Sequence, residues 1–286
     1  MLDWVGSSDV TTWGNDLPRG ISRNDIRAYN HSFHFFNISF RPHDTILFIN
    51  MENQVERLVE KAWQKYEETP KDKRLLIGVA GIPGSGKTTF SQIVTERINA
   101  RAKSNDPSSP PPATFVPMDG FHLTRAALSA MPDPDTAHFR RGAAFTFDAA
   151  KFLTLVQGLS KSPIPSEPIL APSFDHALKD PRDDDIVVKP EHRVVVLEGN
   201  YLALDQDVWR DAAKLLDEVW FVEVDFEVAR KRLRERHVRA GIVKDLEEGD
   251  RRAMENDLVN GKEIIDFRLK VDEVINSRED GSWVHE

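Results

Sequence analysis

The sequence predicts an α/β fold in which a parallel sheet of about five strands carries helices on both faces. Short apolar runs rich in β-branched residues alternate along the chain with longer segments whose apolar residues recur at helical spacing. Strands that alternate with helices usually pair in parallel, so this order indicates a layered α/β domain. The predicted strands cover residues 74–80, 114–118, 193–198, 219–224 and 271–276.

The predicted helices follow from apolar residues at helical spacing. Met51 opens a helix with one apolar face, and Pro70 ends it. Further helices are expected over residues 88–101, 148–156, 226–239 and 247–258, with a turn at Asn260-Gly261. Pro117 predicts an edge position or an irregular pairing for the second strand. The Pro- and Ser-rich residues 103–113 predict a surface connection, while the Pro- and Asp-rich residues 161–187 carry no predicted element.

The first fifty residues differ from the rest because they follow no sustained period. We interpret residues 1–50 as an N-terminal extension of undefined structure, or as an upstream artefact of the gene model. The functional domain is expected to span residues 51–286, with a small helical lid over about residues 228–262.

The composition argues against several classes of protein. The formal net charge of −9 argues against a general affinity for nucleic acid or for anionic membranes. The absence of cysteine excludes disulfides, thiolate metal sites and a cysteine nucleophile. The chain contains no run of 18 apolar residues, and its first residues lack the pattern of a signal peptide. A cytoplasmic protein without nucleic-acid or membrane partners is therefore expected.

A glycine-rich stretch connects the first strand to its helix. The sequence GIPGSGKT fits the pattern G-x-x-x-x-G-K-[ST] of the P-loop, which defines a P-loop NTPase fold. Backbone N–H groups and the helix N-terminus favour a bound phosphate there. Lys87 would reach the β- and γ-phosphates, and Thr88 would offer its hydroxyl to Mg²⁺. The expected nucleotide contacts are Gly81, Ile82, Pro83, Gly84, Ser85, Gly86, Lys87, Thr88 and Thr89.

Two acids follow predicted strands, at the sheet edge where ligands of open α/β sheets bind. Glu198 ends an apolar run, a position typical of an acid that holds Mg²⁺ directly or through water. The alternative is a solvated carboxylate at the start of a loop. Asp119 precedes a glycine and is either a turn residue or the general base for an acceptor hydroxyl. Spacing alone leaves both alternatives for Asp119 open.

Basic residues concentrate in the helix that begins at Phe226. Six cations lie between Arg230 and Arg239, either as a solvated helix face or as a lid that closes over the triphosphate. Arg140 and Arg141 allow the same two interpretations, as a surface pair or as a clamp on the acceptor substrate.

Four stretches together resemble the P-loop kinases of the uridine kinase, phosphoribulokinase and pantothenate kinase group. These stretches are GIPGSGKT, MDGFHL, SFDHALKDP and VVLEGNYLAL. The likeness is greatest to a branch in which D-G-F-H-L, R-[RK]-G-A-x-x-T-F-D and L-E-G-N-Y-L recur in this order. It covers about residues 51–277 and leaves the first fifty residues unexplained.

The resemblance implies a kinase that uses ATP and Mg²⁺ to phosphorylate a hydroxyl of a small metabolite, such as a sugar, a nucleoside or a pantothenate-like molecule. Asp119 would be the general base, and Glu198 would be the Mg²⁺-linked acid. The segment between Asp119 and Phe147 departs from true uridine kinases, so the resemblance does not specify a nucleoside. The implied acceptor contacts are His122, Arg140, Arg141, Phe174, Asp175 and His176, and the implied lid cations are Arg232, Arg236 and Arg239.

Two other functions are considered: a uridine or cytidine kinase proper, and a non-catalytic nucleotide-binding or assembly protein. A GTPase would be expected to carry N-K-x-D, yet no Asn in the chain is followed by Lys. A transporter-type ATPase would be expected to carry an L-S-G-G-Q-like signature, which is also missing. The expected partner is a small-molecule acceptor, and the expected state is a monomer or a homodimer.

Overall fold

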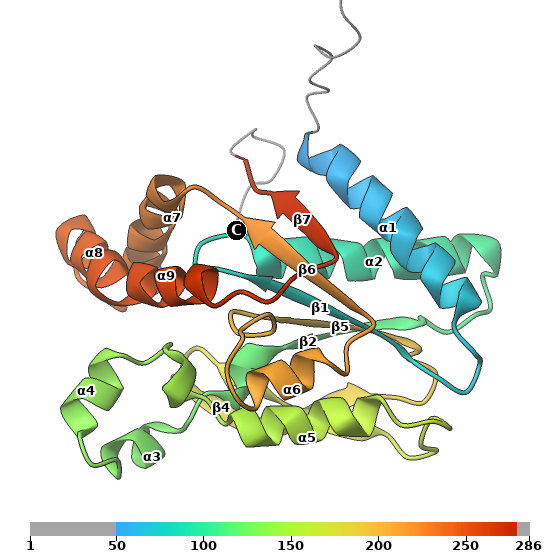
Figure 1. The fold of residues 1–286 in the computed structure, drawn as a ribbon, viewed down its shortest axis with the longest axis horizontal. Helices are drawn as coiled ribbons and strands as arrows, with labels where there is room; N and C mark the ends of the chain where they lie inside the picture. Colours follow the sequence, from blue (N-terminus) through green and yellow to red (C-terminus); the bar gives the residue numbers. More distant parts are fainter. Residues whose placement is uncertain (1–49, 279–286) are drawn as a thin grey trace, which may run out of the picture. The chain divides into compact units, whose positions relative to one another are not determined.

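The computed structural model describes residues 50–278. These residues contain a five-stranded sheet of order β2-β5-β1-β6-β7 (Figure 1). All adjacent strands of this sheet are parallel. The predicted α/β fold with about five strands is thus confirmed, and β2 lies at an edge as Pro117 predicts. The strands are β1 (Leu75–Gly81), β2 (Ala113–Pro117), β5 (Val194–Gly199), β6 (Glu218–Glu223) and β7 (Glu273–Asn276).

Helices cover both faces of the sheet, as predicted (Figure 1). Alternate residues of β1 belong to two separate apolar cores, because successive strand side chains point to opposite faces. Ile77 and Val79 pack in the core that α1 and α2 cover, whereas Leu76 and Ala80 pack in the core that α5 and α6 cover. The covering helices are α1 (Met51–Glu68), α2 (Lys87–Asn105), α5 (Ala149–Leu159) and α6 (Trp209–Ala213).

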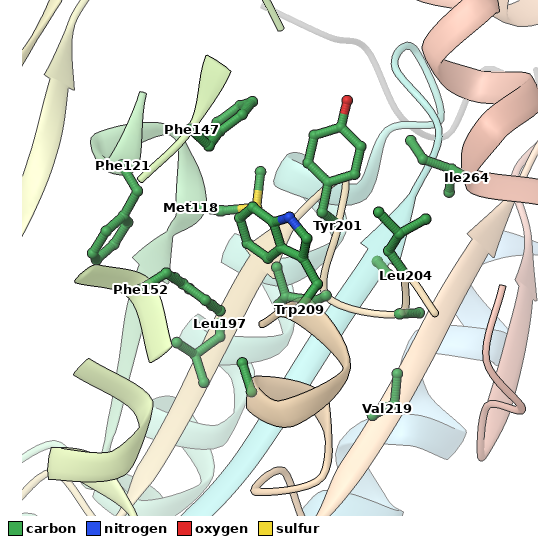
Figure 2. Packing of buried hydrophobic residues seen from close by; sticks show 14 of the residues in the cluster. Met118, Phe121, Phe147, Phe152, Leu197, Tyr201, Leu204, Trp209, Val219 and Ile264 are labelled. Carbon is green, nitrogen blue, oxygen red and sulfur yellow. The ribbon is translucent and has the colours of Figure 1, made fainter. Parts of the chain in front are cut away.

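Aromatic rings form a large part of the core beside α5 and α6 (Figure 2). The ring of Phe152 lies 5.2 Å from that of Phe121 and 5.7 Å from that of Trp209, and Tyr201 lies 5.6 Å from Trp209. Phe121 follows β2 and Tyr201 follows β5. The cluster therefore fixes the backbone at the carboxyl ends of two neighbouring strands.

An antiparallel hairpin occupies most of the segment in which the sequence predicts no element. It consists of β3 (Ile169–Asp175) and β4 (Asp180–Val188). The middle of β4 is exposed and contains three consecutive aspartates, so this strand has no apolar period to detect. The hairpin packs so closely on the turn after β2 that a Cβ at Gly120 would lie 2.1 Å from the carbonyl oxygen of Pro172.

Short elements connect the larger ones at the carboxyl end of the sheet. After β2 come the 3₁₀ turn η2 (Met118–Phe121), α3 (Arg125–Ser129), α4 (Pro134–Phe139) and the 3₁₀ turn η3 (Ala144–Thr146). After β6 come α7 (Phe226–Arg239), α8 (Leu246–Arg252), the π-helical turn η4 (Ala253–Asp257) and α9 (Leu258–Asp266).

The turn that the sequence predicts at Asn260-Gly261 is wrong, because α9 continues through both residues. Asn260 is buried, and its side-chain oxygen accepts a hydrogen bond from Arg140. A Cβ at Gly261 would lie 3.4 Å from Cβ of Ile82 in the P-loop. Tertiary packing thus outweighs the local preference of Asn-Gly for a turn.

Side-chain amides pair with backbone at both edges of the sheet. On β2, Asn99 of α2 accepts from the N–H of Ala113 at 2.8 Å and donates to its carbonyl at 3.0 Å. On β7, Gln54 of α1 accepts from the N–H of Asn276 at 2.9 Å and donates to its carbonyl at 3.1 Å. Each amide takes the place of one residue of a further strand.

The predicted extension, residues 1–50, lies outside the described residues except for Asn50. Asn50 caps α1 by accepting a hydrogen bond from the N–H of Asn53 at 2.8 Å. The proposed domain boundary at Met51 and the monomeric or homodimeric state stay predictions. Between residues 50 and 278, no helix combines the length and the apolar character needed to cross a membrane.

Candidate active site

A cavity of about 760 Å³ opens between the P-loop, the turn after β2, the hairpin and α7. It brings together many predicted site residues that are far apart in the sequence. Its lining includes Gly84, Gly86, Lys87, Thr88, Thr89, Asp119, His176, Arg232, Arg236 and Arg239.

The P-loop takes a backbone conformation that requires glycine at two positions. Gly84 has φ +79° and Gly86 has φ +88°, in the left-handed region that other residues rarely adopt. A Cβ at Gly84 would also lie 2.9 Å from the carbonyl oxygen of Ala229 in α7. Gly86 is the N-cap of α2, so the positive end of this helix borders the cavity. This is the arrangement that favours a bound phosphate.

Lys87 and Glu198 form a buried pair beneath the cavity. Lys87 Nζ lies 3.8 Å from Glu198 Oε1 and 3.5 Å from the carbonyl oxygen of Ile82. Burial raises the pKa of Glu198 to about 7, although the Lys87 ammonium opposes the rise and Asp119 adds to it. Burial likewise lowers the pKa of Lys87. A ligand that brings phosphate to Lys87 and a cation to Glu198 would stabilise the charged form of both side chains.

The donor set beside the P-loop fits Mg²⁺. The Thr88 side chain is hydrogen-bonded to Glu198, so a hydroxyl and a carboxylate stand together at the start of α2. Mg²⁺ commonly takes one or two such protein oxygens and completes its shell with water and substrate phosphates. Within residues 50–278, no group of three or more His, Asp or Glu could hold a metal ion. Thr88 and Glu198 therefore suit a metal ion that arrives with a nucleotide.

Asp119 lies in η2, directly after the edge strand β2, and borders the same cavity. The N-cap of this turn is Pro117, so the Asp119 side chain does not cap it. The negative charge of Asp119 acts on both Lys87 and Glu198. This carboxylate is therefore near the phosphate-binding elements, where a general base for an attacking hydroxyl would be needed.

The structure groups three of the predicted acceptor contacts, His122, Phe174 and His176. The ring of Phe174 lies 4.9 Å from that of His122 and 5.2 Å from that of His176. His122 Nδ1 lies 2.8 Å from the backbone carbonyl of Asp119, which can only accept, so Nδ1 carries the proton. Burial lowers the pKa of His122, which favours the neutral ring and leaves Nε2 as an acceptor.

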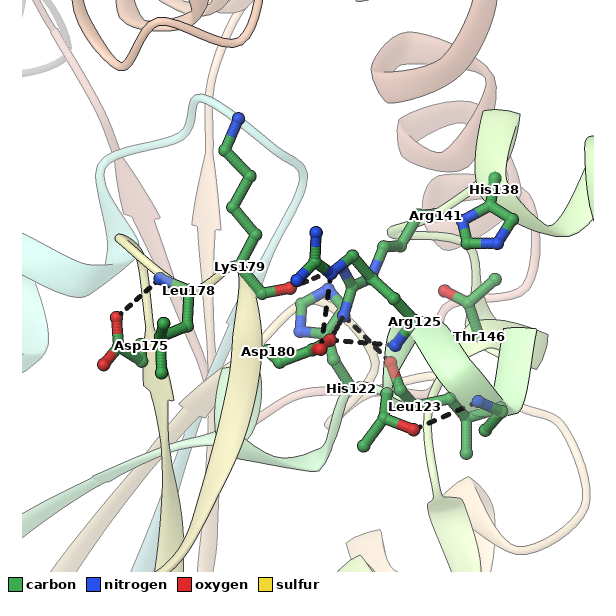
Figure 3. Close-up of polar contacts among 12 residues, drawn as sticks. His122, Leu123, Arg125, His138, Arg141, Thr146, Asp175, Leu178, Lys179 and Asp180 are labelled. Atoms are coloured by element: carbon green, nitrogen blue, oxygen red, sulfur yellow. Dashed lines mark hydrogen bonds and ion pairs between the residues drawn. The ribbon is translucent and has the colours of Figure 1, made fainter. Parts of the chain in front are cut away.

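Three other predicted acceptor residues bind protein atoms, and Figure 3 shows two of them, Asp175 and Arg141. Asp175 Oδ1 accepts from two backbone N–H groups at the hairpin tip, both at 2.9 Å. Arg141 donates to Asp180 and to two backbone carbonyls. Arg140 donates to side-chain oxygens of η4 and α9. Whether these three residues also contact an acceptor stays a prediction.

The basic helix α7 rests against the P-loop. Arg232 Nη1 donates to the carbonyl of Gly84 at 3.2 Å and to Ser277 Oγ at 2.9 Å. Arg230, in contrast, forms a two-bond contact with Asp250 of α8. The cavity also has a cationic wall that the sequence prediction includes only in part. Lys231 and Arg278 add to this wall, and the other residues that line the cavity are Gln92, Leu233, Glu235 and Ala240.

The sequence offered unequal signals for these missed residues. Gln92 lies four residues after Thr88 on α2, so helical spacing could have indicated it. Lys231 is one of the six cations that the sequence places in either a solvated face or a lid, without naming it as a nucleotide contact. Arg278 follows the last strand and belongs to no recognisable motif, so only the fold places it at the cavity.

Comparisons with known proteins agree with this geometry, although no family model matches the chain. The chain is 50% identical over 167 residues to the ATP-dependent kinase-like protein notR' of Aspergillus versicolor, which is 58% of this chain and 95% of that protein. It is 42% identical over 188 residues to C227.14 of Schizosaccharomyces pombe, named as a candidate uridine kinase, with 66% and 77% of the two chains covered.

Among solved structures, YFH7 from Saccharomyces cerevisiae, described as a candidate P-loop containing kinase with a circular permutation, matches with a TM-score of 0.68 and 27% identity. The match covers 79% of this chain and 99% of YFH7. Sequence identity over nearly the whole of a kinase-named relative thus coincides with the P-loop geometry and with the fold. The chain belongs to the family of P-loop kinases.

Proposed function

We propose that the protein transfers the γ-phosphoryl group of Mg·ATP to a hydroxyl group of a small metabolite, within the D-G-F-H-L branch that the sequence resembles. The observation that carries this proposal is one shared cavity. Asp119 and His176 border the same space as the P-loop residues Lys87 and Thr88. A phosphate-binding loop and a carboxylate suited to base catalysis are the two parts that transfer to a hydroxyl requires.

In the proposed reaction, the acceptor hydroxyl loses its proton to the Asp119 carboxylate, and the hydroxyl oxygen attacks the γ-phosphorus. The bond from the γ-phosphorus to the β–γ bridging oxygen breaks, and ADP leaves. Lys87 binds the β- and γ-phosphates, and Arg232, Arg236 and Arg239 neutralise further charge on the transferred group. Mg²⁺, held by Thr88 and Glu198, would supply additional neutralisation of the phosphate oxygens when bound.

On the acceptor side, His122, Phe174 and His176 are proposed to contact the metabolite. A neutral His122 would accept a hydrogen bond from an acceptor hydroxyl through Nε2. The half-buried ring of Phe174, beside His176, would support a flat or apolar part of the acceptor. Asp175, Arg140 and Arg141 also belong to the proposed acceptor site. Because their side chains bind protein atoms, we propose that they hold its backbone segments in place.

The decisive experiment measures ATP consumption by the purified full chain with separate pools of nucleosides, sugars and pantothenate-like alcohols. A kinase is stimulated by its acceptor, whereas a non-catalytic nucleotide-binding protein is not. Asp119→Asn should then lower acceptor-dependent turnover by about a hundredfold to ten-thousandfold, the usual contribution of a general base.

Two measurements on the same preparation of Asp119→Asn complete the test. ATP affinity should barely change, because the proposed base faces the acceptor, and slow acceptor-independent hydrolysis should persist. The melting temperature shows whether the variant is folded. Near-normal turnover together with a lowered melting temperature would make Asp119 a structural turn residue and would contradict the proposed mechanism.

A further inference from the structure

Two consecutive arginines between α4 and η3 bind two different parts of the protein. Arg141 binds the hairpin: Nη1 donates to the carbonyl of Lys179 at 2.6 Å, and Nη2 lies 2.8 Å from Asp180 Oδ1 (Figure 3). Arg140 binds the helical segment after α8: Nε donates to Asn256 Oδ1 at 3.0 Å and Nη2 donates to Asn260 Oδ1 at 2.5 Å.

The contacts on the helical side are buried and reciprocal. Asn256 and Asn260 are each 1% exposed. Asn256 Nδ2 also donates to the backbone carbonyl of Arg141 at 3.1 Å, so one asparagine binds both members of the pair. Asn256 belongs to the π-helical turn η4, and such turns often occur at functional sites. Buried hydrogen bonds to a charged group hold their partners in a defined geometry.

The residue after Asn256 continues the connection to the nucleotide side. Asp257 Oδ2 lies 2.8 Å from Nε2 of His237, which is 3% exposed on the inner face of α7. His237 directly follows Arg236, which lines the cavity. A movement of α7 toward bound phosphates would therefore act on η4, and through η4 on the arginine pair.

The other end of the connection reaches the acceptor side. Asp180 and Lys179 belong to the same hairpin as His176, which lines the cavity. The backbone between the two ends is itself anchored, because the Tyr201 hydroxyl donates to the carbonyl of Gly142 at 2.6 Å. Tyr201 is fully buried in the aromatic core. The loop that carries the arginines is thus fixed at its centre and bound at both sides.

We propose that Arg140 and Arg141 are positioning residues that couple nucleotide contacts on α7 to the placement of the β3–β4 hairpin. The inference rests on the proposed kinase function. It explains why both side chains donate to protein atoms at positions where the sequence suggests a clamp on the acceptor. Because coupling between two binding sites is reciprocal, an ordered hairpin should in turn favour the nucleotide.

Hydrogen exchange of the full chain, with and without a nonhydrolysable Mg·ATP analogue, tests this coupling without knowledge of the acceptor. In the wild-type protein, the analogue should slow amide exchange in the P-loop, residues 82–90. It should also slow exchange in the first strand and the tip of the hairpin, residues 169–180. The expected factor is about fivefold or more, the lower end of typical site-to-site coupling.

Variants then separate coupling from general stability. Arg140→Met should keep the protection of the P-loop and lose that of the hairpin, while Arg140→Lys, which retains one donor group, should restore part of it. Arg97→Met is the matched control, because Arg97 forms a comparable two-bond contact with Glu52 on α2 and α1. The control should retain both protections.

A second variant guards against poor folding of Arg140→Met. Asp180→Asn weakens the contacts of the hairpin with Arg141 and Arg125 and leaves those of Arg140 with η4 and α9 in place, so it should weaken nucleotide protection of the hairpin and keep that of the P-loop. Hairpin protection at the wild-type level in both Arg140→Met and Asp180→Asn would overturn the coupling. An unprotected P-loop in the wild-type protein would instead overturn the proposed nucleotide use, and the coupling with it.

Discussion

The phosphate-binding loop is built from neighbours in the sequence, whereas the contacts of Arg140 and Arg141 join segments that are far apart in the chain. The P-loop obtains its shape from left-handed glycines and from the helix that follows directly. Arg141, in contrast, donates to Leu123 and Asp180, which are 18 and 39 residues away. Arg140 reaches Asn260, which is 120 residues away.

We therefore expect substitutions to impair the two regions in different ways. A local loop fails when its own backbone or its lysine is changed, and its surroundings matter less. An assembled surface fails when a connecting side chain is lost, even one that is remote from the reacting atoms. Such a surface can also change its binding preference without any change in the phosphate-binding loop.

Within the phosphate-binding loop, the largest effect is expected from Lys87→Ala. The phosphates would lose their fixed buried cation, and turnover should fall by about a hundredfold to a thousandfold, as for loss of a preorganised transition-state donor. Steady-state kinetics together with ATP-binding calorimetry measures both consequences. Wild-type turnover in a folded Lys87→Ala protein would contradict the assignment of the whole site.

A pair of glycine variants tests how strongly the P-loop depends on its close contact with α7. Gly84→Ala combines left-handed strain with a clash against the Ala229 carbonyl, so the free energy of unfolding should fall by about 2–4 kcal/mol. Gly241→Ala meets only the strain, because its φ is +61° and nothing lies within 4 Å, so about 1–2 kcal/mol is expected. Urea unfolding and ATP affinity report the difference. Equal losses would show that contact with α7 contributes nothing.

The pH dependence of stability tests the buried carboxylate. The pKa of Glu198 rises from 4.5 to about 7 on folding, mainly through burial. The folded state then binds this proton more tightly, so its contribution to stability is full below pH 4.5 and is lost as the pH rises through 7. In Glu198→Gln without nucleotide, this decline should shrink by an amount on the order of 1–3 kcal/mol. Unfolding curves with the same pH dependence in both proteins would contradict the raised pKa.

The same variant tests the metal assignment. Glu198→Gln should require more Mg²⁺ for half-maximal turnover, while nucleotide binding through the P-loop survives. An unchanged Mg²⁺ titration would contradict the metal assignment and leave Glu198 as the buried partner of Lys87 alone.

The smallest effect is expected from Arg125→Ala on the acceptor side. Its side chain is 57% exposed, and its ion pair with Asp180 should contribute less than about 1 kcal/mol. The backbone N–H of residue 125 would still donate to Asp180. Thermal unfolding should hardly change. A large loss would show that the exposed member of this cluster, and not the more buried Arg141, holds the hairpin.

The sequence predicts the sheet and the P-loop well because both depend on short-range patterns. Short apolar runs indicate the five strands, and the P-loop motif places Lys87 between a strand and a helix. The hairpin escapes prediction because exposed aspartates interrupt its apolar pattern. The partners of Arg140 escape it for another reason: no local pattern relates this residue to Asn256 and Asn260, and the Asn-Gly pair suggests a turn in place of a helix.

The two side-chain amides at the margins of the sheet have a consequence for self-association. Outer strands expose N–H and C=O groups that invite strands of other molecules, a common origin of aggregation. Asn99 and Gln54 occupy these groups on Ala113 and Asn276. Pro117 removes a further donor from β2, and β7 has only four residues. Both margins are thereby protected against intermolecular strand addition by residues that lie on helices.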